Sequence, residues 1–175
     1  WLWRKNGEGF PVTFTANPML IDGQLRGSVV AFRDITELRK MTEALQDSNE
    51  RMLGFINALP DVVVIKDGEN RWQTANQAAI SLLQLEHIDW QGKTNAELAD
   101  IHPGYANFHH AALSTDGAAW IRGNLTLSIE NLAADEGQTR VSEVRKMPIF
   151  YPDGRPKALM VIARDISERR QACSG

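Results

Sequence analysis

Two segments of the chain alternate apolar and polar residues, turn at an Asp-Gly pair and lead into nearly the same motif. The first, FPVTFTANPMLIDGQLRGSVVAFRD, ends at Asp34, and the second, TRVSEVRKMPIFYPDGRPKALMVIARD, ends at Asp165. In both, the Asp-Gly pair lies twelve residues before the final Asp (34 − 22 and 165 − 153), and Pro18 and Pro148 hold similar places before the turn. Because Asp-Gly tolerates positive φ, each segment predicts an antiparallel hairpin, and the two copies form an internal repeat.

Each hairpin leads directly into a predicted helix. Asp34-Ile-Thr-Glu37 and Asp165-Ile-Ser-Glu168 have the spacing of a capping box, in which the Asp accepts from a free helix N–H and the Glu reaches back. The first helix is expected to run from Ile35 to about Leu59, because Pro60 ends it.

The first of these helices carries an apolar seam at alternating spacings of three and four, interrupted at Ser48. Its members are Leu38, Met41, Leu45, Met52 and Phe55. Such a seam is typical of a helix that pairs with a second copy, although an ordinary surface helix shows the same pattern over so short a length.

The rest of the chain predicts one complete α+β domain. The expected elements are a strand at Val62–Lys66, a turn at Asp67-Gly68, a strand at Arg71–Ala75, a helix at Gln77–Leu85 capped by Asn76, a capping box at Thr94-Asn-Ala-Glu97, a long helix from Pro103 to near Trp120, and strands at Asn124–Leu132, Thr139–Pro148 and Lys157–Arg164. This order predicts a five-stranded antiparallel sheet with helices on one face.

Composition narrows the class of protein. Hydrophobic residues make up 43% of the chain and charged residues 23%, which is typical of a globular domain. The net charge of −3 argues against a nucleic-acid partner. No apolar run reaches the ~20 residues of a membrane span, so no membrane contact is expected. The single Cys173 forms no internal disulfide, and a cytoplasmic location is the simpler expectation.

The chain resembles the PAS domain family, the sensor modules of bacterial signalling proteins. The resemblance rests on RDIT and RDIS, each followed by Glu and basic residues, and on the opening LPDVVVIKDGENRWQTANQAAISLLQL. It implies one complete PAS domain at 60–165, a linker or signalling helix at 35–59, and the start of a C-terminal signalling helix at 166–175. Residues 1–34 resemble the last three strands of a preceding PAS domain, and are expected to form a partial three-stranded sheet.

The resemblance also implies a function. The chain, which starts at Trp1, looks like part of a longer signalling protein whose output domain is a histidine kinase or a diguanylate cyclase. The fragment itself shows no catalytic constellation, so we expect no enzyme activity from it. Asp34, Glu37, Asp165 and Glu168 would couple each sheet to the following helix. A scaffold that only mediates protein contacts is the alternative.

The cofactor signatures of the family narrow the choice of ligand. Photoactive flavin domains need a reactive Cys where this chain reads ANQAAISLL, and redox flavin domains need an aromatic residue after the Asn, where this chain has Gln77. Haem is a sharper alternative, because Pro103-Gly-Tyr105 leads to His109, although the Arg that meets a haem propionate is missing. A small organic ligand or none is the preferred hypothesis. The candidate pocket residues are Trp72, Thr74, Trp90, Tyr105, His109 and Trp120, whose alternative role is core packing.

A homodimer is the expected assembly. The partial sheet has apolar side chains that no other segment is left to cover, namely Phe10, Val12, Phe14, Val29, Val30 and Phe32. We expect a second copy to cover them, with the linker helices lying in parallel.

Overall fold

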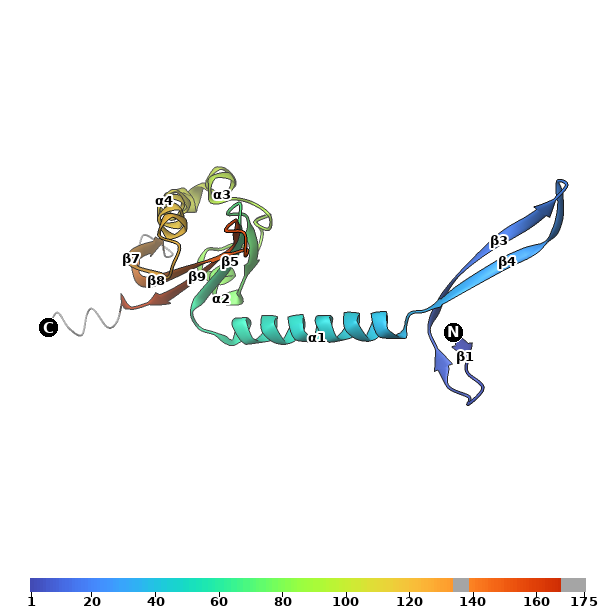
Figure 1. The fold of residues 1–175 in the computed structure, drawn as a ribbon. Coiled ribbons are helices and arrows are strands. Elements are labelled where there is room, and N and C mark those ends of the chain that lie inside the picture. The colour runs from blue at the N-terminus through green and yellow to red at the C-terminus, as the bar shows by residue number, and fades with distance from the viewer. Residues whose placement is uncertain (134–138, 168–175) are drawn as a thin grey trace. The chain divides into compact units, whose positions relative to one another are not determined.

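The computed structural model describes residues 1–133 and 139–167, which divide into two compact units, Trp1–Met52 and Leu53–Gly175 (Figure 1). Glu168, Cys173 and most of the expected C-terminal helix lie outside the described residues.

The second unit is built on a five-stranded antiparallel sheet, as predicted. Its strands are β5 (Val62–Asp67), β6 (Trp72–Ala75), β7 (Thr126–Ala133), β8 (Thr139–Phe150) and β9 (Pro156–Asp165), in the order β6-β5-β9-β8-β7. The first and last strands of the domain in sequence order, β5 and β9, therefore lie side by side in the middle of the sheet.

Helices α2 (Gln77–Leu82) and α4 (Ala106–Arg122) pack on one face of this sheet, and α3 (Asn95–Ile101) packs on α4. A 3₁₀ turn, η1 (Pro103–Tyr105), precedes α4. Asn76 Oδ1 accepts from Ala79 N at 3.0 Å, and Thr94 and Glu97 form the predicted capping box. The helix expected at 77–85 ends earlier, because Gln84 adopts a left-handed φ of 50°.

The core of the second unit lies between the helices and the sheet. It contains Val64, Trp72, Ala79, Leu83, Leu85, Leu98 and Tyr105. The turn between β5 and β6 packs closely on the start of β9, where a Cβ atom on Gly68 would lie only 2.3 Å from the Pro156 carbonyl oxygen. Gly68 is therefore required for the close approach of two backbones.

The first unit corrects the expected three-stranded sheet. β1 (Leu2–Trp3) pairs only with β2 (Gly9–Phe10), and β3 (Val12–Ile21) pairs only with β4 (Gln24–Asp34). Pro11 separates the two hairpins and has no N–H to donate to a continuous ladder. The turn of the longer hairpin follows the sequence prediction, since Asp22 and Gly23 both have positive φ, of 50° and 74°.

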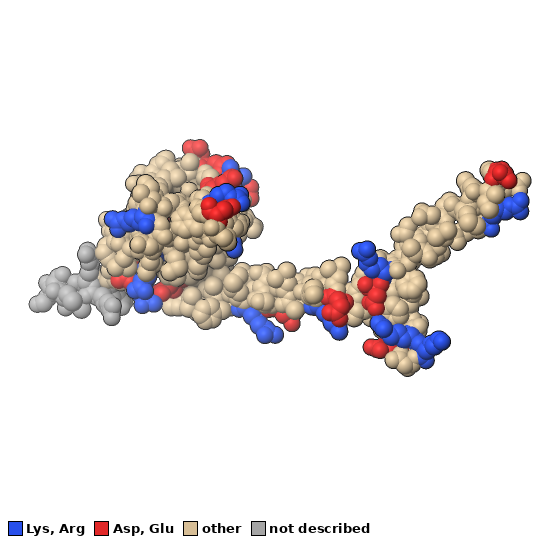
Figure 2. All heavy atoms as spheres, in the orientation of Figure 1, with Lys and Arg blue, Asp and Glu red and all other residues tan. Residues whose placement is uncertain are grey.

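The linker helix α1 (Thr36–Ala58) lies within one residue of its predicted bounds at each end. All five apolar seam residues are more than half exposed in the single chain. The β3–β4 hairpin also exposes Phe14, Val30 and Phe32, and Figure 2 shows an almost uncharged surface between its ends. Within 1–133 and 139–167, no helix has both the length and the apolar character needed to cross a membrane.

Candidate functional site: a buried ion network beside an apolar cavity

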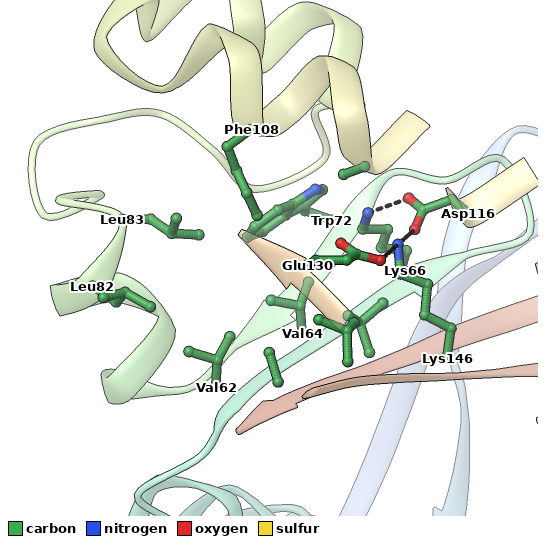
Figure 3. Close-up of a pocket in the computed structure, with 14 residues that line it drawn as sticks. Val62, Val64, Lys66, Trp72, Leu82, Leu83, Phe108, Asp116, Glu130 and Lys146 are labelled. Carbon is green, nitrogen blue, oxygen red and sulfur yellow. Dashed lines mark hydrogen bonds and ion pairs between the residues drawn. The ribbon is translucent and has the colours of Figure 1, made fainter. Parts of the chain in front are cut away.

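A small cavity lies between α4, α2 and the covered face of the sheet. Its volume is about 30 Å³. Ten apolar side chains line it, from Val62, Val64, Trp72, Leu82, Leu83, Phe108, Ala112, Val144, Val161 and Ala163. Four charged side chains close one end, from Lys66, Asp116, Glu130 and Lys146 (Figure 3). The cavity is therefore amphipathic, with its charges gathered at a single end.

Asp116 joins two buried lysines from different strands. Its Oδ2 accepts from Lys66 Nζ at 2.5 Å, and its Oδ1 accepts from Lys146 Nζ at 2.8 Å. The side chains of all three are only 3% exposed. Lys146 also donates to the Thr115 hydroxyl, and its Nζ lies 3.7 Å from Glu130 Oε1. Helix α4 is thereby tied through one carboxylate to both β5 and β8.

In the network, the positive charges of the buried lysines and the negative charges of the carboxylates neutralise one another. Burial lowers the pKa of the Lys66 ammonium, while the charge of Asp116 and its hydrogen bond act in the opposite direction. Lys66 Nζ also lies 5.4 Å from the centre of the Trp72 ring, a cation–π contact. Buried charges of this kind are tolerated only when paired, so any change in one member must be compensated by another.

Asn95 connects the network to the aromatic part of the core. Its Nδ2 donates to Asp116 Oδ2 at 3.1 Å, and its Oδ1 accepts from Trp72 Nε1 at 3.0 Å. His109 Nδ1 lies 3.3 Å from the same Oδ1, so Nδ1 carries the proton of the neutral ring. Burial is the main cause that lowers the pKa of His109 to about 4, and the ring is therefore neutral at physiological pH.

The end of β9 forms a joint with the segment that follows. Asp165 Oδ1 accepts from Ser167 N at 2.8 Å, and Ile166 N donates to the Val141 carbonyl at 2.9 Å. Arg140 lies 3.4 Å from the other Asp165 oxygen. Hydrogen bonds from the Ser167 hydroxyl and amide hold the pKa of Asp165 below its usual range.

The first unit repeats this joint where β4 meets α1. Asp34 Oδ1 accepts from Thr36 N and from the Thr36 hydroxyl, and Ile35 N donates to the Pro11 carbonyl at 3.1 Å. Arg4 pairs with the other Asp34 oxygen at 2.9 Å. Glu37 forms an ion pair with Lys40 at 3.8 Å on the surface of α1, so Asp34 accepts hydrogen bonds from the first turn as expected, but Glu37 does not reach back to complete the predicted capping box. The two copies of the sequence motif therefore form the same local structure.

Comparison with known proteins identifies the family. Residues 56–171 match the family described as the PAS fold, and residues 2–37 match the PAS domain family. The chain belongs to the PAS family. The PAS domain at 56–171 is complete in fold, whereas the shorter match covers the two hairpins and the joint at Asp34.

The relatives of this PAS chain include a sensor protein. Aerobic respiration control sensor protein ArcB of Escherichia coli (strain K12) is 29% identical over 121 residues, which are 67% of this chain and 14% of ArcB. The chain thus matches only a small part of that relative.

Solved structures show the same fold. The PAS domain of Bordetella pertussis BvgS is 22% identical, with a TM-score of 0.54, and the match covers 73% of this chain and 93% of that one. The phage VqmA–DPO complex is 20% identical, with a TM-score of 0.56, over 77% of this chain and 60% of that one.

Of the six pocket candidates from the sequence, only Trp72 lines the cavity of this PAS domain. Trp90 packs edge-on against Trp72, Tyr105 donates through its hydroxyl to the Leu82 carbonyl, and Trp120 donates from Nε1 to Asn70 Oδ1. Thr74 pairs with Ile65 in the β5–β6 ladder. These residues support the fold around the cavity and do not form its wall.

The PAS domain does not fit a haem in this form. His109 is fully buried among the rings of Trp72, Phe108 and His102, and it is not among the cavity-lining residues. A cavity of about 30 Å³ holds little more than a water molecule. Among 1–133 and 139–167, no group of three or more His, Cys, Asp or Glu side chains is arranged to hold a metal ion.

Sequence reasoning missed the four charged residues of the network. A signal for two of them exists in the strand alternation, because Lys66 follows Val62 and Val64 on one face of β5, and Lys146 follows Val144 on β8. A cation on the face that buries valines indicates either a buried ion pair or a ligand site. Its partner Asp116 is 50 residues away from Lys66, beyond the reach of a local pattern.

Proposed function

We propose that this PAS domain is a sensor that transmits the state of its cavity through β9 to the segment that follows Asp165. One observation carries the proposal: Val161 and Ala163 of β9 form part of the cavity wall, and the same strand ends at the Asp165 joint. A change in cavity contents that shifts β9 would therefore alter the geometry from which the next helix starts.

We also propose that the domain transmits its signal to an output domain in a larger protein. ArcB is named as a sensor protein, and the chain matches a small part of it, which supports a place within a larger signalling protein. We propose a histidine kinase or a diguanylate cyclase as the output.

A homodimer through α1 completes the proposed assembly. The exposed seam of α1 and the exposed apolar side chains of the β3–β4 hairpin support it, since large apolar groups gain about 1.5–3 kcal/mol each on burial. A parallel pair of α1 helices would bury the seam.

Amide hydrogen exchange tests the coupling. Ala112→Leu fills the cavity from α4, and the matched change Ala111→Leu adds the same side chain at the exposed neighbouring position. We expect Ala112→Leu to change the exchange of the Ile166 and Ser167 amides, and Ala111→Leu to leave it unchanged. If both variants exchange like the wild type at these amides, the domain is better described as a scaffold. A Soret band in the absorption spectrum of the purified protein would instead support haem.

A further inference from the structure

We propose that the cavity binds a short-chain carboxylic acid in its ionised form. Its carboxylate takes the place of the Glu130 carboxylate beside Lys146, and its hydrocarbon part lies against the apolar wall. The inference rests on the proposed function, because it names the ligand class of the same cavity.

Glu130 is the member of the network that is held least tightly. Its Oε1 lies 3.7 Å from Lys146 Nζ, whereas Asp116 lies 2.8 Å from the same atom. Its side chain is 15% exposed, against 3% for Asp116, and it projects from β7, a strand at the edge of the sheet. Its Oε1 accepts a hydrogen bond from the hydroxyl of Ser128, its neighbour on the same strand and face, at 2.8 Å. Glu130 can therefore turn outward without breaking the Asp116 bridge.

The charges of the network require that the ligand carboxylate replace the Glu130 carboxylate rather than add to it. Two lysines face two carboxylates, so an added anion would leave the buried cluster with an excess negative charge. When Glu130 turns into water, Lys146 loses one of its two carboxylate neighbours. A ligand carboxylate in that position restores the balance and gains a charge-assisted hydrogen bond.

A second hollow provides a route to this position. It has a volume of about 130 Å³, lies open to solvent, and is lined by Thr115, Ala118, Arg122, Thr126, Leu127, Ser128 and Lys146. Lys146 lines both this hollow and the inner cavity. The exposed cation Arg122 at the hollow favours the approach of an anion.

The volume of the inner cavity limits the size of the ligand. Pockets for drug-sized molecules measure roughly 300–1,000 Å³, ten or more times the volume here. A Glu130 side chain that turns outward vacates its carboxylate and Cγ, which leaves space for the acid group and the carbon next to it, and the existing cavity can take one or two further carbon atoms. Propionate, butyrate and isobutyrate fit this description.

Calorimetric titration of the whole chain with isobutyrate tests the proposal, with isobutyramide as the neutral probe of the same shape. We expect isobutyrate to bind and isobutyramide to bind at least about tenfold more weakly. Glu130→Gln removes the internal competitor and should tighten isobutyrate binding by about tenfold. The matched control is Glu143→Gln on β8, a carboxylate that pairs with Arg145 and does not line the cavity. It should leave binding unchanged.

Three outcomes would overturn the inference: no binding of isobutyrate, equal binding of the amide, or weaker binding to Glu130→Gln than to the wild type. Lys146→Met should abolish isobutyrate binding, but it also removes a buried cation from the ion network and can destabilise the fold. The Glu130→Gln variant is therefore the decisive test of the proposal. If Ala112→Leu changes hydrogen exchange at the Ile166 and Ser167 amides but isobutyrate does not bind, the proposed ligand class is wrong, whereas the proposed sensor function is still supported.

Discussion

Asp116→Ala should destabilise the PAS domain strongly, because it leaves Lys66 and Lys146 buried without their shared carboxylate. Removing one partner of a buried ion pair typically costs about 3–5 kcal/mol. For a domain whose total stability is of the order of 5–15 kcal/mol, the variant should still fold but unfold at much lower denaturant concentration. With a urea slope of at most about 3 kcal/mol per molar, the midpoint should fall by about 1 M or more.

The assay is urea unfolding followed by tryptophan fluorescence. Trp72 is buried in the domain, whereas Trp1 and Trp3 are more than two-thirds exposed and should change little. Asp89→Ala is the control, because this carboxylate pairs with Lys93 on the surface at 3.5 Å. Its midpoint should match that of the wild type.

The pH dependence of the Asp116→Ala deficit gives an independent check. Burial lowers the pKa of Lys66, and without Asp116 that pKa falls further, whereas the pKa of an unfolded lysine is about 10.4. The unfolded state therefore binds more protons between these values, and the stability of the variant rises with pH over a wider range than that of the wild type. The deficit should be smaller at pH 9.5 than at pH 7. A deficit no larger than that of Asp89→Ala, or one that grows with pH, would refute the reasoning.

Three further predictions concern the joint and the assembly. Asp165→Ala should lower the local stability of the joint by about 1 kcal/mol and raise hydrogen exchange at the Ser167 amide about fivefold. In the wild type, the stabilisation by Asp165 is present above the ordinary Asp pKa of 3.8 and is lost as the pH falls below it, because the pKa of Asp165 is lowered in the fold. Leu45→Lys should convert a dimer at tens of micromolar into a monomer in sedimentation, while Gln46→Lys, off the seam, should not; a wild-type monomer would contradict the pairing. Deletion of residues 1–33 should leave a folded PAS domain that dimerises more weakly, and equal dimerisation in sedimentation would argue against a role for the hairpins.

Local patterns predicted most of the fold. Alternation and Asp-Gly located the β3–β4 hairpin, and the Thr94 and Asn76 caps fixed the starts of α3 and α2. The second Asp-Gly pair was less informative, because β8 and β9 are joined by five residues in which only Gly154 has positive φ. The partial sheet at the N-terminus was predicted, but its pairing as one three-stranded sheet was wrong, because a family resemblance does not show where Pro11 interrupts the hydrogen bonding.

The candidate site was predicted less well. Aromatic residues indicate packing but not the surface against which they lie, so Trp90 and Trp120, which the sequence offered as pocket candidates, pack and hydrogen-bond elsewhere and do not line the cavity. The charged end of the cavity depends on contacts between β5, α4, β7 and β8, which only the tertiary structure brings together. Strand alternation by itself could have indicated Lys66 and Lys146, but not Asp116 or Glu130.

The joints at Asp34 and Asp165 have a consequence for how multidomain proteins of this kind gain and lose domains in evolution. Each joint uses only residues from its own hairpins and the first turn that follows, so neither depends on the identity of the next domain. A whole sensory module can therefore be duplicated, inserted or lost between two joints without a new interface being invented. Such a change should preserve the direction that the intervening helix faces: seven or eleven added residues change this direction by only about 20°, whereas five or nine rotate it by about 140° or 180°.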